Sequence, residues 1–413
     1  MTKTQSLIGW VLVSKQDVAH AERALLDEVK GVRDELGILQ MHQFISDTLF
    51  PGTSVLHTRL RYALFVPWML RRAAEEFPRA PTKALERLEV QLTKDLIEGL
   101  KDSSDKDGVI GRRKSPEPAA QPPSFSYWTA LSVWRILSPR LRGLTRRQVL
   151  SHMIEARSAE KTGVKDEQGR VLSEATAAFA GLPQEPAGFW ESKPTTFALR
   201  RPEANFLREH LAAVRAPDGG ASLLSRLAEA DHAPGASQPW LDPVVRAAAT
   251  EQHLQFLDFA RKCSSLGGIC RGLYLAMVEQ QAARAGFGEA GLHRDHLQEL
   301  LVQHRDTALQ LDLGQLPACG IHFHVDDPLP ALFRDTQKWL RHRRGSIESL
   351  LPSYIETERF RKKGRARLGG TDISRARLAL WADKESGAQA EVLHFRWNNV
   401  RQLLTDLHAA PQI

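Results

Sequence analysis

A run of nine consecutive apolar or aromatic residues, 62–70, is the feature that most constrains how this chain can fold. A helix that is apolar on every side is buried on every side, and nine residues are far fewer than the ~20 that a helix needs to cross a bilayer. The preceding residues 50–53 read FPGT and predict a turn, after which Thr53 or Ser54 would cap the helix. We therefore predict a helix over residues 54–72 at the centre of a folded core.

Arginines stand just before this apolar run. An arginine that is buried there needs a carboxylate partner, because an unpaired buried charge is strongly destabilising. We expect a structural charge network in which Asp34 and Glu35 pair with Arg59 and Arg61. The alternative is a phosphate site at the turn of residues 51–53, where helix N–H groups and arginines would converge.

Helical periodicity dominates the remainder of the 413 residues, a length that suggests about two or three domains. We predict a mainly α, multi-helical protein with a small C-terminal α/β portion. The predicted regions are an N-terminal helical region (1–101) around the buried helix 54–72, a linker (102–126), a helical region (127–315) and a basic C-terminal α/β portion (316–413). Three predicted strands, 319–325, 376–381 and 390–396, supply the β component. The linker is rich in proline and glycine, and we expect a protease to cut it first.

The basic charge of the chain is local. The formal net charge is +7, whereas residues 338–377 carry twelve Lys or Arg against four acids, a net charge of +8. Local basicity is typical of a surface for a polyanion, and mutual repulsion within such a run favours a neutralising partner. We expect the run to be exposed. The alternatives are an acidic protein partner and a solvated helix end that pairs with neighbouring acids.

We predict that nucleic acid, with DNA as the expected form, binds this segment non-specifically. The predicted contact residues are Arg341, Arg343, Arg344, Arg359, Arg361, Lys362, Lys363, Arg365 and Arg367, with lesser help from Arg112 and Arg113. The nearby Trp339, His342 and Phe360 are candidates to stack on bases.

Two weaker motifs raise the alternative of a cryptic metal-dependent nuclease. The first consists of Cys319, His322, His324 and Asp326. Its histidines would share a face of a strand, but the spacing matches no standard zinc site. In the second, Glu191 and Lys193 match half of a nuclease motif that needs another acid to hold magnesium. We predict no bound metal, no cofactor and no catalytic residue, and we do not expect an enzyme.

The three cysteines, Cys263, Cys270 and Cys319, are too few for a disulfide framework and indicate a reducing cytoplasm. The N-terminal apolar run is confined to residues 7–13 and lacks the longer core of a signal peptide. We expect a cytoplasmic protein without a membrane partner.

Several motifs carry a resemblance to a known group of proteins. They are LFPGTS…HTRLRYALFVPW (49–68), RDELGI (33–38), IGRR (110–113), YWTALSVW (127–134), Pro239-Trp240 and FRWNNVRQLL (395–404). Together they resemble a family of uncharacterised bacterial proteins, a domain of unknown function whose members tend to be encoded in phage-defence gene clusters. The proline-rich residues 115–124 depart from it. The resemblance implies a cellular setting, near helicases and DNA methyltransferases, and supplies no activity.

We therefore predict an accessory component of a bacterial antiviral defence system, which binds nucleic acid and works with other defence proteins such as a helicase or a DNA methyltransferase. The alternatives are a helical scaffold that holds partner defence proteins together without touching nucleic acid, and the cryptic nuclease.

Overall fold

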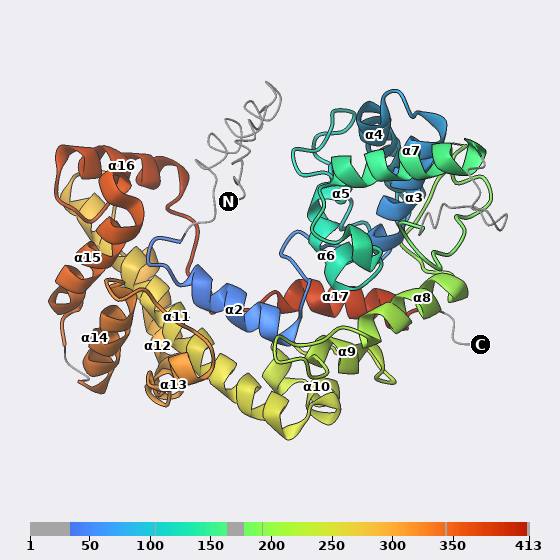
Figure 1. The fold of residues 1–413 in the computed structure, drawn as a ribbon. Helices are drawn as coiled ribbons and strands as arrows, with labels where there is room; N and C mark the ends of the chain where they lie inside the picture. Colours follow the sequence, from blue (N-terminus) through green and yellow to red (C-terminus); the bar gives the residue numbers. More distant parts are fainter. Residues whose placement is uncertain (1–33, 104, 163–176, 192, 343–344, 411–413) are drawn as a thin grey trace, which may run out of the picture. The chain divides into compact units, whose positions relative to one another are not determined.

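The structure is a computed structural model that describes residues 34–103, 105–162, 177–191, 193–342 and 345–410, and it is built of helices (Figure 1). The α-helices are α2 (Leu39–Leu49), α3 (Tyr62–Glu76), α4 (Pro81–Gly99), α5 (Pro123–Ser126), α6 (Trp128–Val133), α7 (Arg146–Thr162), α8 (Arg201–Ala212), α9 (Leu223–Ala228), α10 (Pro243–Ala248), α11 (Glu251–Arg284), α12 (Leu292–Leu309), α13 (Gln315–Ala318), α14 (Leu329–Arg341), α15 (Leu351–Lys362), α16 (Asp372–Lys384) and α17 (Trp397–His408). The 3-10 helices are η1 (Pro139–Leu141), η2 (Pro239–Leu241), η3 (Ile347–Leu350) and η4 (Lys363–Arg365). The predicted mainly α fold is confirmed.

The predicted C-terminal α/β portion is wrong, because the described residues contain no strand. Residues 376–381 lie in α16, whose buried side chains Ser374, Leu378 and Trp381 follow a helical period of three to four residues. Residues 390–394 form no ladder, and the carbonyl of Leu393 accepts a hydrogen bond from the Ser264 hydroxyl at 2.8 Å. Residues 319–325 form turns and loop after α13.

The chain folds into two compact units, each assembled from three separate stretches of sequence. Unit 1 comprises Met1–Leu39, Arg271–Leu297 and Phe323–Gln389, and unit 2 comprises Gln40–Cys270, Gln298–His322 and Ala390–Ile413. The predicted linker, residues 102–126, lies within unit 2. The order in which a protease would cut the chain stays a prediction.

Helix α3 is the core of unit 2, as its apolar run predicts. All residues from 62 to 70 are buried, and α4 and α7 pack against this helix (Figure 1). The Phe65 ring stacks on Phe189 with 5.6 Å between centroids, and the Tyr62 ring contacts Phe197 at 5.4 Å. Aromatic pairs of this kind add about 0.5–1.5 kcal/mol to the free energy of burial.

Helix α3 begins at Tyr62, so the prediction of a helix over residues 54–72 is wrong at its N-terminal end. Within residues 58–60, the first two backbone N–H groups donate to the Tyr127 hydroxyl at 3.0 and 3.1 Å, and the third donates to the Asp406 carboxylate at 2.8 Å. A helix would need these groups for its own carbonyls. Partners far along the chain therefore hold this segment out of the helix, and the local sequence does not reveal them.

The two arginines before α3 are buried and paired. Arg59 contacts Asp406 with 2.8 Å between Nη2 and Oδ1, and Arg61 contacts Glu203 with 2.9 Å between Nη2 and Oε1. Although burial disfavours its charge, the bonds to Asp406 raise the pKa of Arg59. Removing one partner of a buried pair typically costs about 3–5 kcal/mol, so these contacts fix the position of α3.

In unit 1, α14 and α15 pack against each other in antiparallel directions. The hydroxyls of Thr336 and Tyr354 lie 3.1 Å apart, while Asp327, ahead of α14, pairs with Arg361 near the end of α15. The buried Glu358 carboxylate then shapes the turn after α15, because it accepts hydrogen bonds from the two backbone N–H groups of residues 367 and 368 at 2.9 and 2.8 Å.

Candidate nucleic-acid interface

The long side chains on one exposed face of α14 are all basic. Arg334, Lys338 and Arg341 are spaced by four and three residues, which places them on the same face over two helical turns. All three are exposed, and none forms an ion pair with another residue that the structure describes. Their positive charge is therefore available to a ligand.

The opposite face of α14 explains why these side chains point outward. Leu332, Phe333 and Leu340 are at most 2% exposed and occupy the interleaving positions of the same helix. An amphipathic helix buries its apolar face and leaves its charged face in water. The packing of α14 therefore fixes the direction of the basic face.

A second exposed group stands where α15 ends. Arg359, Lys363 and Arg365 are exposed, and Lys363 has a left-handed backbone with a φ of 49°. The Phe360 ring is 43% exposed, with the Arg361 guanidinium 5.1 Å from its centroid. Cations at the C-terminus of a helix are stabilised by the helix dipole, so the group is tolerated without acid partners.

Two predicted contact residues are structural instead, so the expected exposure of the whole run is wrong. Arg361 pairs with Asp327, whose side chain is 3% exposed. Arg367 pairs with Glu35 and Glu385 and donates to the Tyr274 hydroxyl. Although burial disfavours its charge, these partners raise the pKa of Arg367.

The remaining predicted residues of unit 1 divide in the same way. Lys362 is half-buried, and His342 is exposed. Trp339 is half-buried and donates its indole N–H to the carbonyl of Gly345 at 3.0 Å. Arg343 and Arg344 lie outside the described residues.

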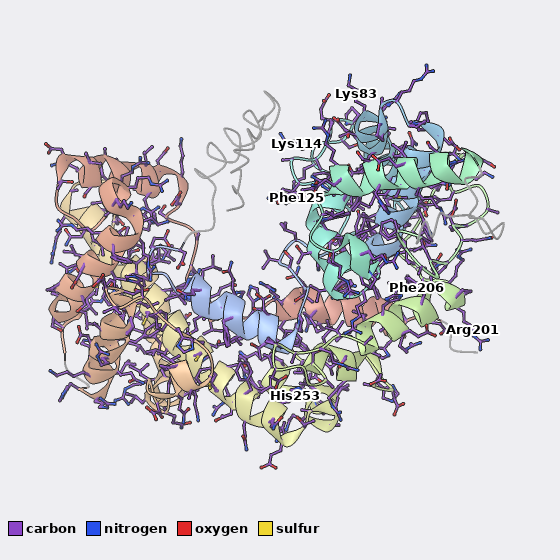
Figure 2. All side chains as sticks on the ribbon, in the orientation of Figure 1. Lys83, Lys114, Phe125, Arg201, Phe206 and His253 are labelled. Atoms are coloured by element: carbon purple, nitrogen blue, oxygen red, sulfur yellow. The ribbon has the colours of Figure 1, made fainter. Side chains whose placement is uncertain are left out.

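Arg112 and Arg113 lie in unit 2, at the rim of a hollow of about 420 Å³ that the loop 106–114 and residues 119–121 line. Both arginines are exposed, and Arg112 donates to the carbonyl of Lys106 at 2.6 Å. Figure 2 labels Lys114 of the same loop. These arginines belong to unit 2, whereas the basic face of α14 belongs to unit 1.

The weak metal candidates do not form a ligand cluster. No group of three or more His, Cys, Asp or Glu side chains converges among the described residues. His324 and Asp326 lie 3.7 Å apart, and both side chains are more than three-quarters exposed. Burial raises the pKa of the Cys319 thiol, which disfavours the thiolate that a metal needs. Since residues 321–324 form no strand, the alternation that would align His322 with His324 does not apply.

The two residues that match half of a nuclease motif form a contact with each other. Lys193 and Glu191 lie in a loop and pair with each other at 2.6 Å, with both side chains more than 60% exposed. Each charge is therefore satisfied by the other.

The predicted charge network takes a different form. Asp34 and Glu35 belong to unit 1, where Asp34 accepts hydrogen bonds from the backbone N–H groups of residues 37 and 39 at 2.9 and 3.1 Å and Glu35 pairs with Arg367. Arg59 pairs instead with Asp406 of α17 and with the exposed Asp105, and Arg61 pairs with Glu203 of α8.

The alternative of a phosphate site at residues 51–53 has no exposed helix terminus to support it. Pro51 and Thr53 are buried, and α3 begins nine residues after Thr53. The Trp134 indole donates to the carbonyl of Pro51 at 3.1 Å and covers the turn.

The sequence reasoning missed Arg334 because the basic stretch was counted from residue 338. The spacing of Arg334, Lys338 and Arg341 by four and three residues, which is typical of one helix face, is the signal that could have found it. For Asp406 and Glu203, the acids that pair with the buried arginines, no local signal exists.

The fold and this surface define a mainly helical protein with paired buried arginines and exposed basic faces. Residues 5–296 match a family of unknown function, DUF6361, and the chain belongs to that family. No curated protein and no solved structure matches the chain. Within the described residues, no helix combines the length and apolar character needed to span a membrane.

Proposed function

We propose that the protein binds nucleic acid non-specifically, by its phosphate backbone, through the exposed basic side chains of unit 1. The observation that carries the proposal is the face of α14, where Arg334, Lys338 and Arg341 stand together without acid partners among the described residues. The exposed Arg359, Lys363 and Arg365 extend the same unit's positive charge.

The physical reason is counterion release. Duplex DNA carries a condensed atmosphere of cations, and each Lys or Arg placed on a phosphate releases some of them, so affinity falls with salt by a log–log slope of about −0.9 per contact. Three contacts from α14 would contribute about −2.7 to that slope. Flexible Lys and Arg side chains on a helix follow a backbone without reading bases, which accounts for the absence of sequence preference in the proposal.

The test is a salt titration of binding to a short fluorescent DNA duplex. Replacing Arg334, Lys338 and Arg341 together by Gln should make the log–log slope less negative by about 2.7. The matched control replaces Lys83, Arg87 and Arg201 of unit 2 by Gln, since these side chains are also exposed and the change in net charge is the same. Figure 2 labels two of them, Lys83 and Arg201.

The control variant should keep the wild-type slope. A wild-type affinity that does not change with salt, or a triple α14 variant with the wild-type slope, would overturn the proposal.

The proposal places this binding in the cytoplasm, in an accessory component of an antiviral defence system that acts with a helicase or a DNA methyltransferase. The resemblance described above supports the defence setting, and the small number of cysteines, three in the whole sequence, supports a reducing compartment. Deleting the gene from its native cluster should lower protection against phage in a plaque assay. Unchanged protection would remove the defence setting and leave the binding proposal intact.

A helical scaffold is the second candidate, because α16 exposes apolar side chains seven residues apart. Ile373 is 60% exposed and Leu380 is 48% exposed, beside the face of the helix that buries Leu378 and Trp381. A scaffold would bind no DNA even at low salt and would lose a co-purifying partner when Ile373 and Leu380 are replaced by Ser.

A further inference from the structure

The hollow in unit 2 combines positive charge with a fixed backbone. Its lining includes Lys106, Arg112, Arg113 and Lys114 but only one acid, Asp107. Arg113 and Lys114 are exposed and form no ion pair with any described residue. A volume of about 420 Å³ lies within the range of sites that hold small ligands or parts of larger ones.

The loop that forms the hollow is anchored to the core. The Thr58 hydroxyl donates to the carbonyl of Gly108 at 2.6 Å, and the N–H of Ile110 donates to the Tyr62 hydroxyl at 2.9 Å. Gly108 has a left-handed φ of 93°, and a Cβ there would lie 2.6 Å from the Cγ of Arg59. The loop is therefore held in place before any ligand arrives, which lowers the cost of binding.

An exposed aromatic ring stands beside the hollow. Phe125, in α5, is four residues from Gln121 of the lining, so their Cα atoms are at most about 14 Å apart. Figure 2 labels Phe125 and Lys114 on the same side of unit 2. The Phe125 side chain is 48% exposed, and the Arg146 guanidinium lies 5.6 Å from its ring centroid.

The sequence around this ring is strongly basic. Residues 112–154 carry eight Lys or Arg and one acid, a net charge of +7, and Glu117 is that acid. Arg146 is held in place by a 2.7 Å bond to the Ser124 hydroxyl, while Arg147 beside it is exposed. Positive charge therefore lies on both sides of Phe125 along the chain.

We propose that the hollow and Phe125 form a second site, which binds single-stranded nucleic acid. Phosphates lie against Arg113, Lys114 and Arg147, and an unpaired base stacks on Phe125. Bases of a duplex are stacked on one another and cannot offer a face to a protein ring, so an exposed ring within a basic surface favours a single strand. The site is independent of the α14 face, and it adds a substrate class to the proposed function.

The test measures binding of the full-length protein to fluorescent oligo(dT), which cannot pair with itself, and to a DNA duplex. Phe125→Ala should weaken oligo(dT) binding by about tenfold, the loss expected for one stacked base. Phe125→Trp should restore it, because tryptophan also stacks. Duplex binding should remain within about twofold of wild type, since it depends on unit 1 in the proposed function.

Phe77 offers a matched control within unit 2. Its side chain is 39% exposed, and the Arg87 guanidinium lies 5.8 Å from its ring centroid, but it does not line the hollow. Phe77→Ala should bind oligo(dT) as wild type does. A wild-type affinity of Phe125→Ala for oligo(dT), or an equal loss in Phe77→Ala, overturns the second site.

The two proposals fail separately. If oligo(dT) binds and loses affinity on Phe125→Ala while the duplex does not bind, the second site stands and the α14 surface does not. If polyglutamate competes as well as oligo(dT) and Phe125→Ala has no effect, the hollow is a general anion surface and the single-strand inference is wrong.

Discussion

The basic face of α14 and the basic turn after α15 differ little in composition and greatly in how their charges are used. On α14, Arg334, Lys338 and Arg341 are exposed and lack acid partners among the described residues. In contrast, Arg361 near the end of α15 and Arg367 in the turn after it are held by carboxylates. The difference lies in whether a carboxylate is within reach, so the density of basic residues in a sequence overstates the charge that a ligand can use.

The largest effect is expected when the charges of the two paired arginines are reversed. Replacing Arg361 and Arg367 together by Glu should lower the free energy of unfolding by more than about 5 kcal/mol, because Asp327, Glu35 and Glu385 would face new negative charge. Urea denaturation measures the loss. A midpoint equal to that of wild type would mean that these side chains are as free as those of α14.

A second test compares a paired arginine of unit 2 with an exposed arginine that has no acid partner among the residues described. Arg59→Ala should cost about 3–5 kcal/mol, because it leaves the buried Asp406 carboxylate unpaired. Arg113→Ala, at the exposed rim of the hollow, should change stability by less than about 0.5 kcal/mol. Equal urea midpoints for the two variants would contradict the distinction between paired and available arginines.

Burial has a pH signature at His57. Burial lowers the pKa of His57 to about 4, although the hydrogen bond between its ring and the carbonyl of Ser126 raises it. The unfolded chain takes up this proton near pH 6.5 and the folded chain only near pH 4, so the stability that His57 contributes is complete above pH 6.5 and is lost as pH falls toward 4. The loss amounts to about 3 kcal/mol.

The measurement is the free energy of unfolding of wild type and His57→Gln between pH 4 and 8. The difference between the two proteins should be constant above pH 7 and should change by about 3 kcal/mol toward pH 4, with wild type losing more. A difference that stays constant over the whole range would contradict a buried, neutral imidazole.

Only a small effect on stability is expected for substitutions on the α14 face itself. The triple replacement of Arg334, Lys338 and Arg341 by Gln should change the free energy of unfolding by no more than about 0.5 kcal/mol per residue, while the salt dependence of DNA binding falls. Thermal unfolding and the salt titration, run on the same preparation, separate the two effects. A large loss of stability would place these side chains with Arg361 and Arg367.

The sequence predicted those features of the fold that follow from helical periodicity. Helical spacing identified the helical fold, and the unbroken apolar run of residues 62–70 identified the core of unit 2. Both signals are local, since a side chain's face follows from its position in the helix.

What the sequence did not predict depends on contacts between distant residues. Tyr127 and Asp406 bind the backbone before α3 and so determine where this helix begins. The acids that pair with the central arginines, Glu203 and Asp406, also lie far along the chain. In the candidate site, the sequence alone does not distinguish the exposed Arg359 from the half-buried Arg367, because the difference depends on the positions of Glu35 and Glu385. The predicted strand at residues 376–381 was wrong because a short apolar run does not distinguish a strand from a buried helix segment, and these residues lie in α16.

The pairing of Arg59 with Asp406 has a consequence for synthesis of the protein. The two residues are 347 positions apart, so at about 5–20 residues per second the ribosome needs roughly 20–70 s to deliver the carboxylate after the arginine. Until then Arg59 and the backbone N–H of Leu60, just before α3, lack the Asp406 carboxylate, although α4 and α7, which pack against α3, have already been made. We expect the growing chain to depend on a chaperone during this interval, and the completed protein not to.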